Sequence, residues 1–243
     1  MHFRLDETSV YRCAEWERLP WLEHGFGTRL SEGWVPEEAS ADLKQVHSDL
    51  IVRADEPMHR AREGDALVTN EPGLWIRVRT ADCLPVLLVD QRRRAVGAAH
   101  CGWRGTALAL ATAMVRRMGE EFGSEPEDLR AAIGPGIGSC CFEVGAEVAQ
   151  EFRQIFPERA DLDRTTKLDL AEALRRQLAG VGLRTERITH CELCTRCGEN
   201  LFHSFRRDRE AAGRMESGIR VRLRPVRGMK EGLQPRRRSP GNQ

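Results

Sequence analysis

The chain has 243 residues, of which 40% are hydrophobic, and its formal net charge at pH 7 is only +1. This length permits a sizeable core in one large domain or two small ones, and the balanced charge gives no reason to expect a nucleic-acid partner. The sequence contains no apolar run of about 18 residues, so we expect no membrane-spanning helix.

The N-terminus and the cysteine content favour a cytoplasmic protein. Residues 1–7 lack the apolar core of a secretory signal. Eight cysteines could suggest disulfides, but without such a signal, reduced thiols or metal ligands are the better interpretation.

Short apolar runs in the first half of the chain predict strands. The predicted strands are residues 43–47 and 50–53, which read as a tight hairpin around Ser48 and Asp49, then 65–69, 74–79, 86–89 and 95–99. The last two runs flank a charged turn, so we expect them to pair as buried antiparallel neighbours.

The second half of the chain mixes helices with strands. Helical spacing predicts helices at 106–122, 144–156 and 168–179, and strands are predicted at 188–191, 201–206 and 219–223. The pattern indicates an α+β sandwich without a regular βαβ repeat. We predict a single catalytic domain over 1–225 and a basic, disordered tail over 226–243.

Three residues at predicted strand ends form a candidate metal site. Cys83 precedes the run 86–89, His100 follows the run 95–99, and His47 closes an upstream strand. Antiparallel pairing would bring Cys83 and His100 to one end of the sheet. Two imidazoles and a thiolate are a plausible zinc set with an open fourth position, although a satisfied polar His and a buried Cys would give the same pattern.

A second candidate metal site is a run of cysteines with two-residue gaps. Cys191, Cys194 and Cys197 could begin a zinc or iron–sulfur site, with His190 or His203 as the fourth ligand. The sequence offers no obvious matching ligand pair elsewhere.

Arginines and a serine are candidates for binding an anion. Arg104 lies near glycines at a strand-to-helix junction, where a helix start favours negative charge. Ser204 and Arg206 would share one face of a predicted strand and could grip an oxyanion or phosphate. A helix-start Arg paired with an acid and a surface Arg pair are the plainer alternatives.

Six motifs in order resemble one known family. They are Gln45-Val46-His47, Gly64-Asp65-Ala66-Leu67-Val68-Thr69, Thr80-Ala81-Asp82-Cys83-Leu84-Pro85-Val86, His100-Cys101-Gly102-Trp103-Arg104-Gly105, Ile133-Gly134-Pro135-Gly136-Ile137 and Ser204-Phe205-Arg206-Arg207. Over about residues 24–221 the chain resembles the YfiH family, also called the polyphenol oxidase (laccase-domain) or purine nucleoside phosphorylase family.

The resemblance implies a three-layer α/β/α sandwich with a mixed sheet and Zn²⁺ held by His47, Cys83 and His100. It also implies phosphorolysis of adenosine, inosine, guanosine or methylthioadenosine, with adenosine deamination as a further reaction. In that setting Arg104, Ser204 and Arg206 would hold phosphate or developing charge. Asp82 would act as a general base or orient His47 or His100.

Some positions depart from the family pattern. Cys101 follows the metal His where Ala is common, and His203 stands where a second aromatic is common. Ala212-Gly213-Arg214 stands where Thr-Gly-Arg is usual. The laccase label itself does not fit, because a multicopper oxidase needs many histidines in His-x-His pairs. This sequence has seven histidines and no such pair.

Two rival hypotheses remain open. Cys83 could be the nucleophile of a hydrolase that acts on an amide in a peptidoglycan precursor, since one branch of the family is linked to editing such precursors. Alternatively, the chain could be a metal-binding protein without turnover.

Overall fold

Two apolar segments form the central strands of the molecule. β9 (Leu84–Asp90) and β10 (Ala95–Cys101) are buried along their whole length and pair antiparallel, with His100 opposite Pro85. Their continuous apolar sequence is typical of strands covered on both faces. Val86 and Leu88 face a layer of helices, whereas Leu87 and Val89 face a second sheet. The predicted antiparallel pairing is confirmed.

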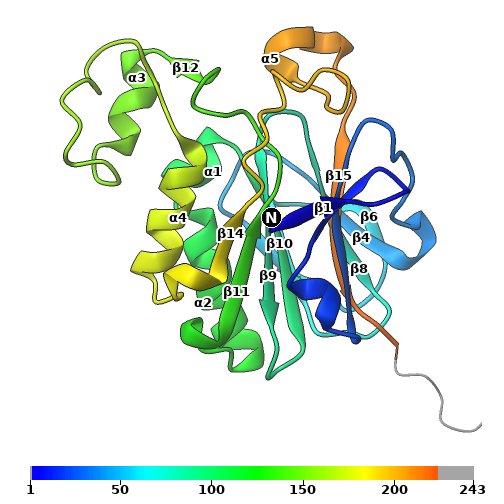
Figure 1. The fold of residues 1–243 in the computed structure, drawn as a ribbon. Coiled ribbons are helices and arrows are strands. Elements are labelled where there is room, and N and C mark those ends of the chain that lie inside the picture. The colour runs from blue at the N-terminus through cyan, green and yellow to red at the C-terminus, as the bar shows by residue number, and fades with distance from the viewer. Residues whose placement is uncertain (1, 224–243) are drawn as a thin grey trace, which may run out of the picture.

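The computed structural model describes residues 2–223, which form two large sheets (Figure 1). The six-stranded sheet has the order β14 (Ile188–His190), β11 (Leu129–Ile133), β9, β10, β7 (Ala66–Thr69) and β5 (Ile51–Arg53). The seven-stranded sheet has the order β1 (Phe3–Leu5), β2 (Val10–Cys13), β3 (Leu22–Gly27), β15 (Met215–Val221), β8 (Trp75–Thr80), β4 (Ser40–Lys44) and β6 (Met58–Glu63). A small pair joins β12 (Glu143–Val144) to β13 (Thr166–Lys167).

The helices are few and short. They are α1 (Trp103–Ala107), α2 (Leu110–Phe122), α3 (Ala146–Ala149), α4 (Leu170–Gly180) and α5 (Phe205–Asp208). Six 3-10 helices are η1 (Trp16–Arg18), η2 (Glu37–Ala39), η3 (Pro126–Asp128), η4 (Gln150–Phe152), η5 (Thr185–Arg187) and η6 (Arg209–Ala211). Buried residues of α2 and α4 pack on the outer face of the six-stranded sheet and close one hydrophobic core, and the second core lies between the sheets.

The predicted mixed α+β class is confirmed, and the molecule has three layers. Their order is helices, six-stranded sheet and seven-stranded sheet (Figure 1). The layer opposite the helices is therefore a sheet, where the family resemblance implied helices. Its strands β1, β2 and β3 come from the first 30 residues, in which the sequence analysis predicted no element.

Two predicted elements are wrong. Segments 43–47 and 50–53 do not form a hairpin, because β4 belongs to the seven-stranded sheet and β5 to the six-stranded one. The predicted strand 201–206 is instead a loop followed by α5. Ser204 caps the first turn of α5, because its Oγ accepts the Arg207 N–H at 3.2 Å.

Other boundaries shift at specific residues. The predicted helix 106–122 is two helices, α1 and α2, separated at Ala109, which has a left-handed φ of 58°. The predicted helix 144–156 is reduced to α3 and η4. The predicted tail 226–243 lies outside the described residues, and the single domain 1–225 stays a prediction.

Candidate active site

Three predicted ligand residues meet at one end of the six-stranded sheet. The ligand atoms of His47, Cys83 and His100 all lie within 4.8 Å of one another. Cys83 Sγ lies 3.9 Å from His47 Nε2, and the two imidazole ring centroids are 4.8 Å apart. The structure thus brings together residues that are 36 and 17 positions apart along the chain, as their strand-end placement predicted.

Asp65 orients His100 from behind. Its buried carboxylate lies 2.8 Å from His100 Nδ1. This contact directs the other ring nitrogen, Nε2, to the Cys83 side, in the arrangement that carboxylates give to metal-binding histidines. Asp65 also accepts the backbone N–H groups of Val46, His47 and Ser48 at 2.6–3.2 Å.

The loop that carries His47 is anchored to both sheets. Gln45 directly follows β4. Its side-chain amide donates to the Arg79 carbonyl and accepts the Arg79 N–H on β8, both at 2.8 Å. The next turn is held by Asp65, which directly precedes β7 in the other sheet. His47 itself has a φ of 61°, a conformation that these contacts stabilise. The Gln-Val-His motif therefore fixes an imidazole between the two sheets.

Gly102 leaves the space in which the three side chains meet. A Cβ at this position would lie 2.8 Å from Cys83 Sγ and 3.1 Å from His47 Cδ2. Any larger residue would displace the thiolate or the imidazole. The close approach explains why a glycine directly follows His100 and Cys101.

The charge of the three residues favours a thiolate. Burial opposes ionisation of the Cys83 thiol, but the His100 and His47 imidazoles outweigh it and lower the pKa of Cys83 to about 6. Burial likewise opposes the charge on His100, but the Cys83 thiolate and the Asp65 carboxylate raise the pKa of His100 to about 9. A thiolate flanked by imidazoles can bind a metal or act as a nucleophile.

These residues form one side of a cavity of about 620 Å³. Its apolar walls are Trp103, Ile137, Phe142 and Phe205, and its remaining lining residues are Gln45, Arg79, Ala81, Asp82, Arg104, Arg206, Arg209 and Arg214. A cavity of this size accommodates a ligand such as a nucleoside, and aromatic walls suit a planar base.

The cavity is rich in arginines that lack carboxylate partners. Of its five arginines, only Arg79 has its guanidinium within 4.0 Å of a carboxylate among residues 2–223, near Asp42 and Glu216. Arg104 is exposed, and its guanidinium stacks 4.4 Å from the Trp103 ring centroid. Because unpaired guanidiniums attract and grip oxyanions, this cavity suits a phosphate.

Asp82 does not have the predicted contact with the histidines. Its carboxylate accepts the hydroxyl of Thr195 at 2.6 Å, the hydroxyl of Ser204 at 3.1 Å and the backbone N–H of Arg206 at 2.6 Å. The orienting role that the sequence analysis gave Asp82 belongs to Asp65. With three donors directed at it, Asp82 is a structural anchor for the cavity wall and is poorly placed to accept a proton from a substrate.

Ser204 and Arg206 also differ from the prediction. Ser204 is fully buried, does not line the cavity, and uses its hydroxyl to contact Asp82 and cap α5. Ser204 is therefore not placed to grip a phosphate. Arg206 does line the cavity, although its Nη1 also donates to the carbonyl of Glu143 at 2.8 Å.

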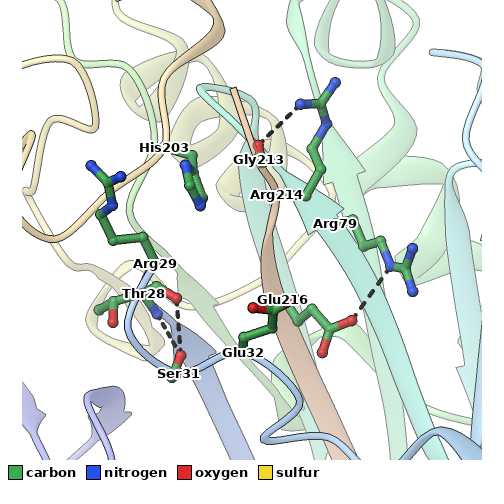
Figure 2. A pocket seen from close by; sticks show the side chains of 9 residues that line it. All are labelled: Thr28, Arg29, Ser31, Glu32, Arg79, His203, Gly213, Arg214 and Glu216. Atoms are coloured by element: carbon green, nitrogen blue, oxygen red, sulfur yellow. Dashed lines mark hydrogen bonds and ion pairs between the residues drawn. The ribbon is translucent and has the colours of Figure 1, made fainter. Parts of the chain in front are cut away.

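A smaller cavity of about 390 Å³ adjoins this one and shares Arg79 and Arg214 with it. Figure 2 shows its lining, in which Arg29 and His203 approach from one side and Glu216 from the other. No role was predicted for Arg79, Arg209 or Arg214. For Arg214, the available signal was its place in the Ala-Gly-Arg run that corresponds to the family's Thr-Gly-Arg.

Comparisons with known proteins identify the family to which this chain is similar. Residues 28–222 match the family model described as multi-copper polyphenol oxidoreductase laccase. A protein of Deinococcus radiodurans named purine nucleoside phosphorylase is 42% identical over 178 residues, which cover 72% of this chain and 67% of that protein. Adenosine deaminase RL5, from an unknown prokaryotic organism, is 37% identical, and the match covers 72% of each chain.

A solved structure has the same fold. The crystal structure of YlmD from Geobacillus stearothermophilus superposes with a TM-score of 0.83 at 30% sequence identity, covering 91% of this chain and 99% of that one. Within residues 2–223, no helix has both the length and the apolar character that a membrane span requires.

Proposed function

Because this chain belongs to the family described as multi-copper polyphenol oxidoreductase laccase, and its matched relatives are named for purine nucleoside chemistry, we propose that it is a zinc-dependent purine nucleoside phosphorylase. The observation that carries this proposal is the position of His47, Cys83 and His100. They lie at the wall of a cavity that also offers aromatic side chains and four arginines whose guanidiniums have no carboxylate partner among residues 2–223. The substrates would be adenosine, inosine, guanosine or methylthioadenosine, together with phosphate.

The donor set fits zinc. His47, Cys83 and His100 would hold the ion with two imidazoles and one thiolate, and three protein ligands would leave a position for water or substrate, as in catalytic zinc sites. A blue-copper centre would use a similar His₂Cys set with a weak axial ligand such as Met or Gln. Among residues 2–223 no Met lines this cavity, and Gln45 uses both ends of its side-chain amide on the Arg79 backbone. The second cluster of metal-binding side chains among residues 2–223 contains only cysteines. This part of the chain therefore offers no cluster of histidines for a multicopper oxidase.

In the proposed reaction, a phosphate oxygen attacks C1′ of the ribose as the bond to the purine nitrogen breaks. The electron pair of that bond leaves with the purine, which takes up a proton, and ribose 1-phosphate forms. Arg104 and Arg206 would hold the phosphate, while Trp103 and Phe142 would stack on the base. Zinc in the open site would supply Lewis-acid polarisation and positive charge close to the reacting groups.

Adenosine deamination is a second candidate reaction, favoured by the match to the relative named adenosine deaminase. It would use water in place of phosphate and release ammonia. Incubating the purified protein with adenosine, with and without phosphate, separates the two reactions. Adenine and ribose 1-phosphate identify phosphorolysis, and inosine with ammonia identifies deamination.

Asp65→Asn is expected to weaken zinc binding about 10- to 100-fold. The Asp65 carboxylate accepts N–H groups from both His100 and the His47 loop, whereas the Asn side chain would offer only one acceptor oxygen. Competition against a chromogenic chelator measures the zinc affinity. Asp55→Asn, which changes an exposed carboxylate paired with Arg53, is the matched control, and equal affinities in both variants would remove Asp65 from the proposed site.

Arg104→Ala is expected to raise the KM for phosphate about 10- to 100-fold, corresponding to the loss of a charge-assisted hydrogen bond of about 1.5–3 kcal/mol. The KM for the nucleoside should change much less. Arg116→Ala, at an exposed position of α2 that does not line the cavity, is the control. An unchanged phosphate dependence would exclude Arg104 from phosphate binding.

A further inference from the structure

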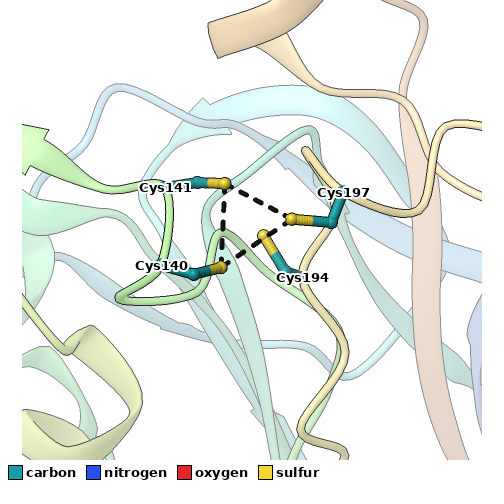
Figure 3. Close-up of side chains that lie close together, drawn as sticks. All are labelled: Cys140, Cys141, Cys194 and Cys197. Carbon is teal, nitrogen blue, oxygen red and sulfur yellow. Dashed lines mark hydrogen bonds between the residues drawn. The ribbon is translucent and has the colours of Figure 1, made fainter.

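Four cysteines from two distant segments form a second cluster (Figure 3). Cys140 and Cys141 lie one residue before β12, separated from it by Phe142, and Cys194 and Cys197 lie in the loop after β14. All four sulfur atoms lie within 4.8 Å of one another. Cys140 and Cys197 are exposed to solvent.

The sulfur–sulfur distances match one tetrahedral ion. Cys141 Sγ lies 3.4 Å from Cys197 Sγ, and Cys140 Sγ lies 3.7 Å from Cys141 Sγ and 3.8 Å from Cys197 Sγ. Four thiolates at about 2.3 Å from a central zinc would be separated by about 3.8 Å, the edge of the tetrahedron.

The backbone around the cluster supports thiolate ligands. The Gly138 N–H donates to Cys194 Sγ at 3.3 Å, the kind of hydrogen bond that stabilises a metal-bound thiolate. A Cβ on Gly138 would lie 3.3 Å from both Cys140 Sγ and Cys194 Cβ, so the glycine allows the two segments to approach. The segments are already joined, since the Thr195 N–H donates to the Gly136 carbonyl at 2.9 Å.

We propose that Cys140, Cys141, Cys194 and Cys197 bind a structural zinc ion as four thiolates. This set corrects the predicted knuckle of Cys191, Cys194 and Cys197 with His190 or His203. Cys191 and both histidines lie outside the group. The adjacent pair Cys140–Cys141 supplies the missing ligands, which spacing within the 191–197 run could not reveal.

The geometry disfavours two other uses of these cysteines. A disulfide has its sulfur atoms about 2.05 Å apart. Here Cys141 Sγ and Cys197 Sγ are 3.4 Å apart, and Cys140 Sγ is almost equally near both. In an iron–sulfur cluster the thiolates bind different iron atoms and are spread around the whole cluster, whereas these sulfurs surround the volume of a single ion.

The ion would fasten the wall of the candidate active site. Ile137 and Phe142, on either side of Gly138, line the large cavity, and Thr195 donates to Asp82. If the proposed function holds, losing this zinc should raise the nucleoside KM more than it lowers kcat. The existence of the site does not depend on that function.

Alkylation of the wild-type protein provides the first test. The protein is reduced with a phosphine, supplied with zinc, freed of excess metal and treated with iodoacetamide, and each cysteine is followed by peptide mass spectrometry. We expect exposed Cys140 and Cys197 to react at least about tenfold more slowly than after zinc is stripped by a chelator. Equally fast alkylation with and without zinc would overturn the proposal, as would a Cys141–Cys197 disulfide that persists when zinc is supplied.

Zinc stoichiometry provides the second test. Wild-type protein and Cys191→Ser should hold about two zinc ions per chain, and Cys194→Ser/Cys197→Ser about one. His47→Ala/His100→Ala should keep the four-sulfur ion, with an X-ray absorption spectrum of sulfur ligands at about 2.3 Å. A single zinc in wild-type protein, lost entirely in that His variant, would contradict the second site even if the Cys double variant does not fold.

Discussion

His100→Ala is expected to lower kcat/KM for adenosine phosphorolysis at least about a thousandfold, or about 4 kcal/mol of transition-state stabilisation. The imidazole is buried, faces Cys83, and is held by Asp65, so no neighbouring side chain can replace it. The zinc proposed to be bound by four cysteines would be retained, so the zinc content should fall from about two ions per chain to about one. The measurements are steady-state kinetics and zinc content on the same preparation.

His59→Ala is the matched control for that variant. His59 lies on the edge strand β6, is 39% exposed, and lies 3.5 Å from Asp42, away from the cavity. Wild-type kinetics are expected. Full activity in folded His100→Ala, or full zinc occupancy of both sites, would refute the assignment of His100 as a ligand.

Asp82→Ala is expected to lower kcat/KM at least about a hundredfold while leaving the zinc content unchanged. Removing the carboxylate leaves the hydroxyls of Thr195 and Ser204 and the N–H of Arg206 without their acceptor. Each buried donor left without a partner costs about 1–3 kcal/mol of stability. The segment that carries Arg206 into the cavity would lose its attachment.

Two further variants separate charge from backbone effects at this position. Asp82 has a φ of 88°, a backbone conformation that Asn tolerates better than Ala. Asp82→Asn therefore tests the loss of the charge and of one acceptor oxygen with less backbone strain than Asp82→Ala. Exposed Asp163→Ala controls for the loss of a surface charge. Wild-type kcat/KM in Asp82→Ala would show that the anchor is not needed for turnover.

The sequence predicted the parts of this molecule that depend on local pattern. The short continuous apolar runs around residues 86–89 and 95–99 are typical of buried strands, and their pairing brought Cys83 and His100 together. The change of sheet between β4 and β5 was not predictable, because a short polar turn looks the same whether its strands pair or separate. The structure shows the cause in the contacts of Gln45 and Asp65 with opposite sheets.

The site was predicted less completely for a similar reason. Alternation suggested a strand through Ser204 and Arg206, but the Ser-x-x-Arg run is a capped helix start whose serine contacts Asp82. Asp65 was visible only as part of a motif, since nothing local shows that one carboxylate serves both His100 and the His47 loop. The four-cysteine cluster depends on a tertiary contact between loops more than 50 residues apart.

Product analysis from adenosine shows whether the protein is a zinc-dependent phosphorylase. Protein with zinc is incubated with adenosine, with and without phosphate, and the same reactions are repeated after chelation and after zinc is restored. We expect adenine and ribose 1-phosphate only when both phosphate and zinc are present. Turnover by metal-free protein without phosphate, with rapid alkylation of Cys83, would instead identify Cys83 as the nucleophile of a hydrolase.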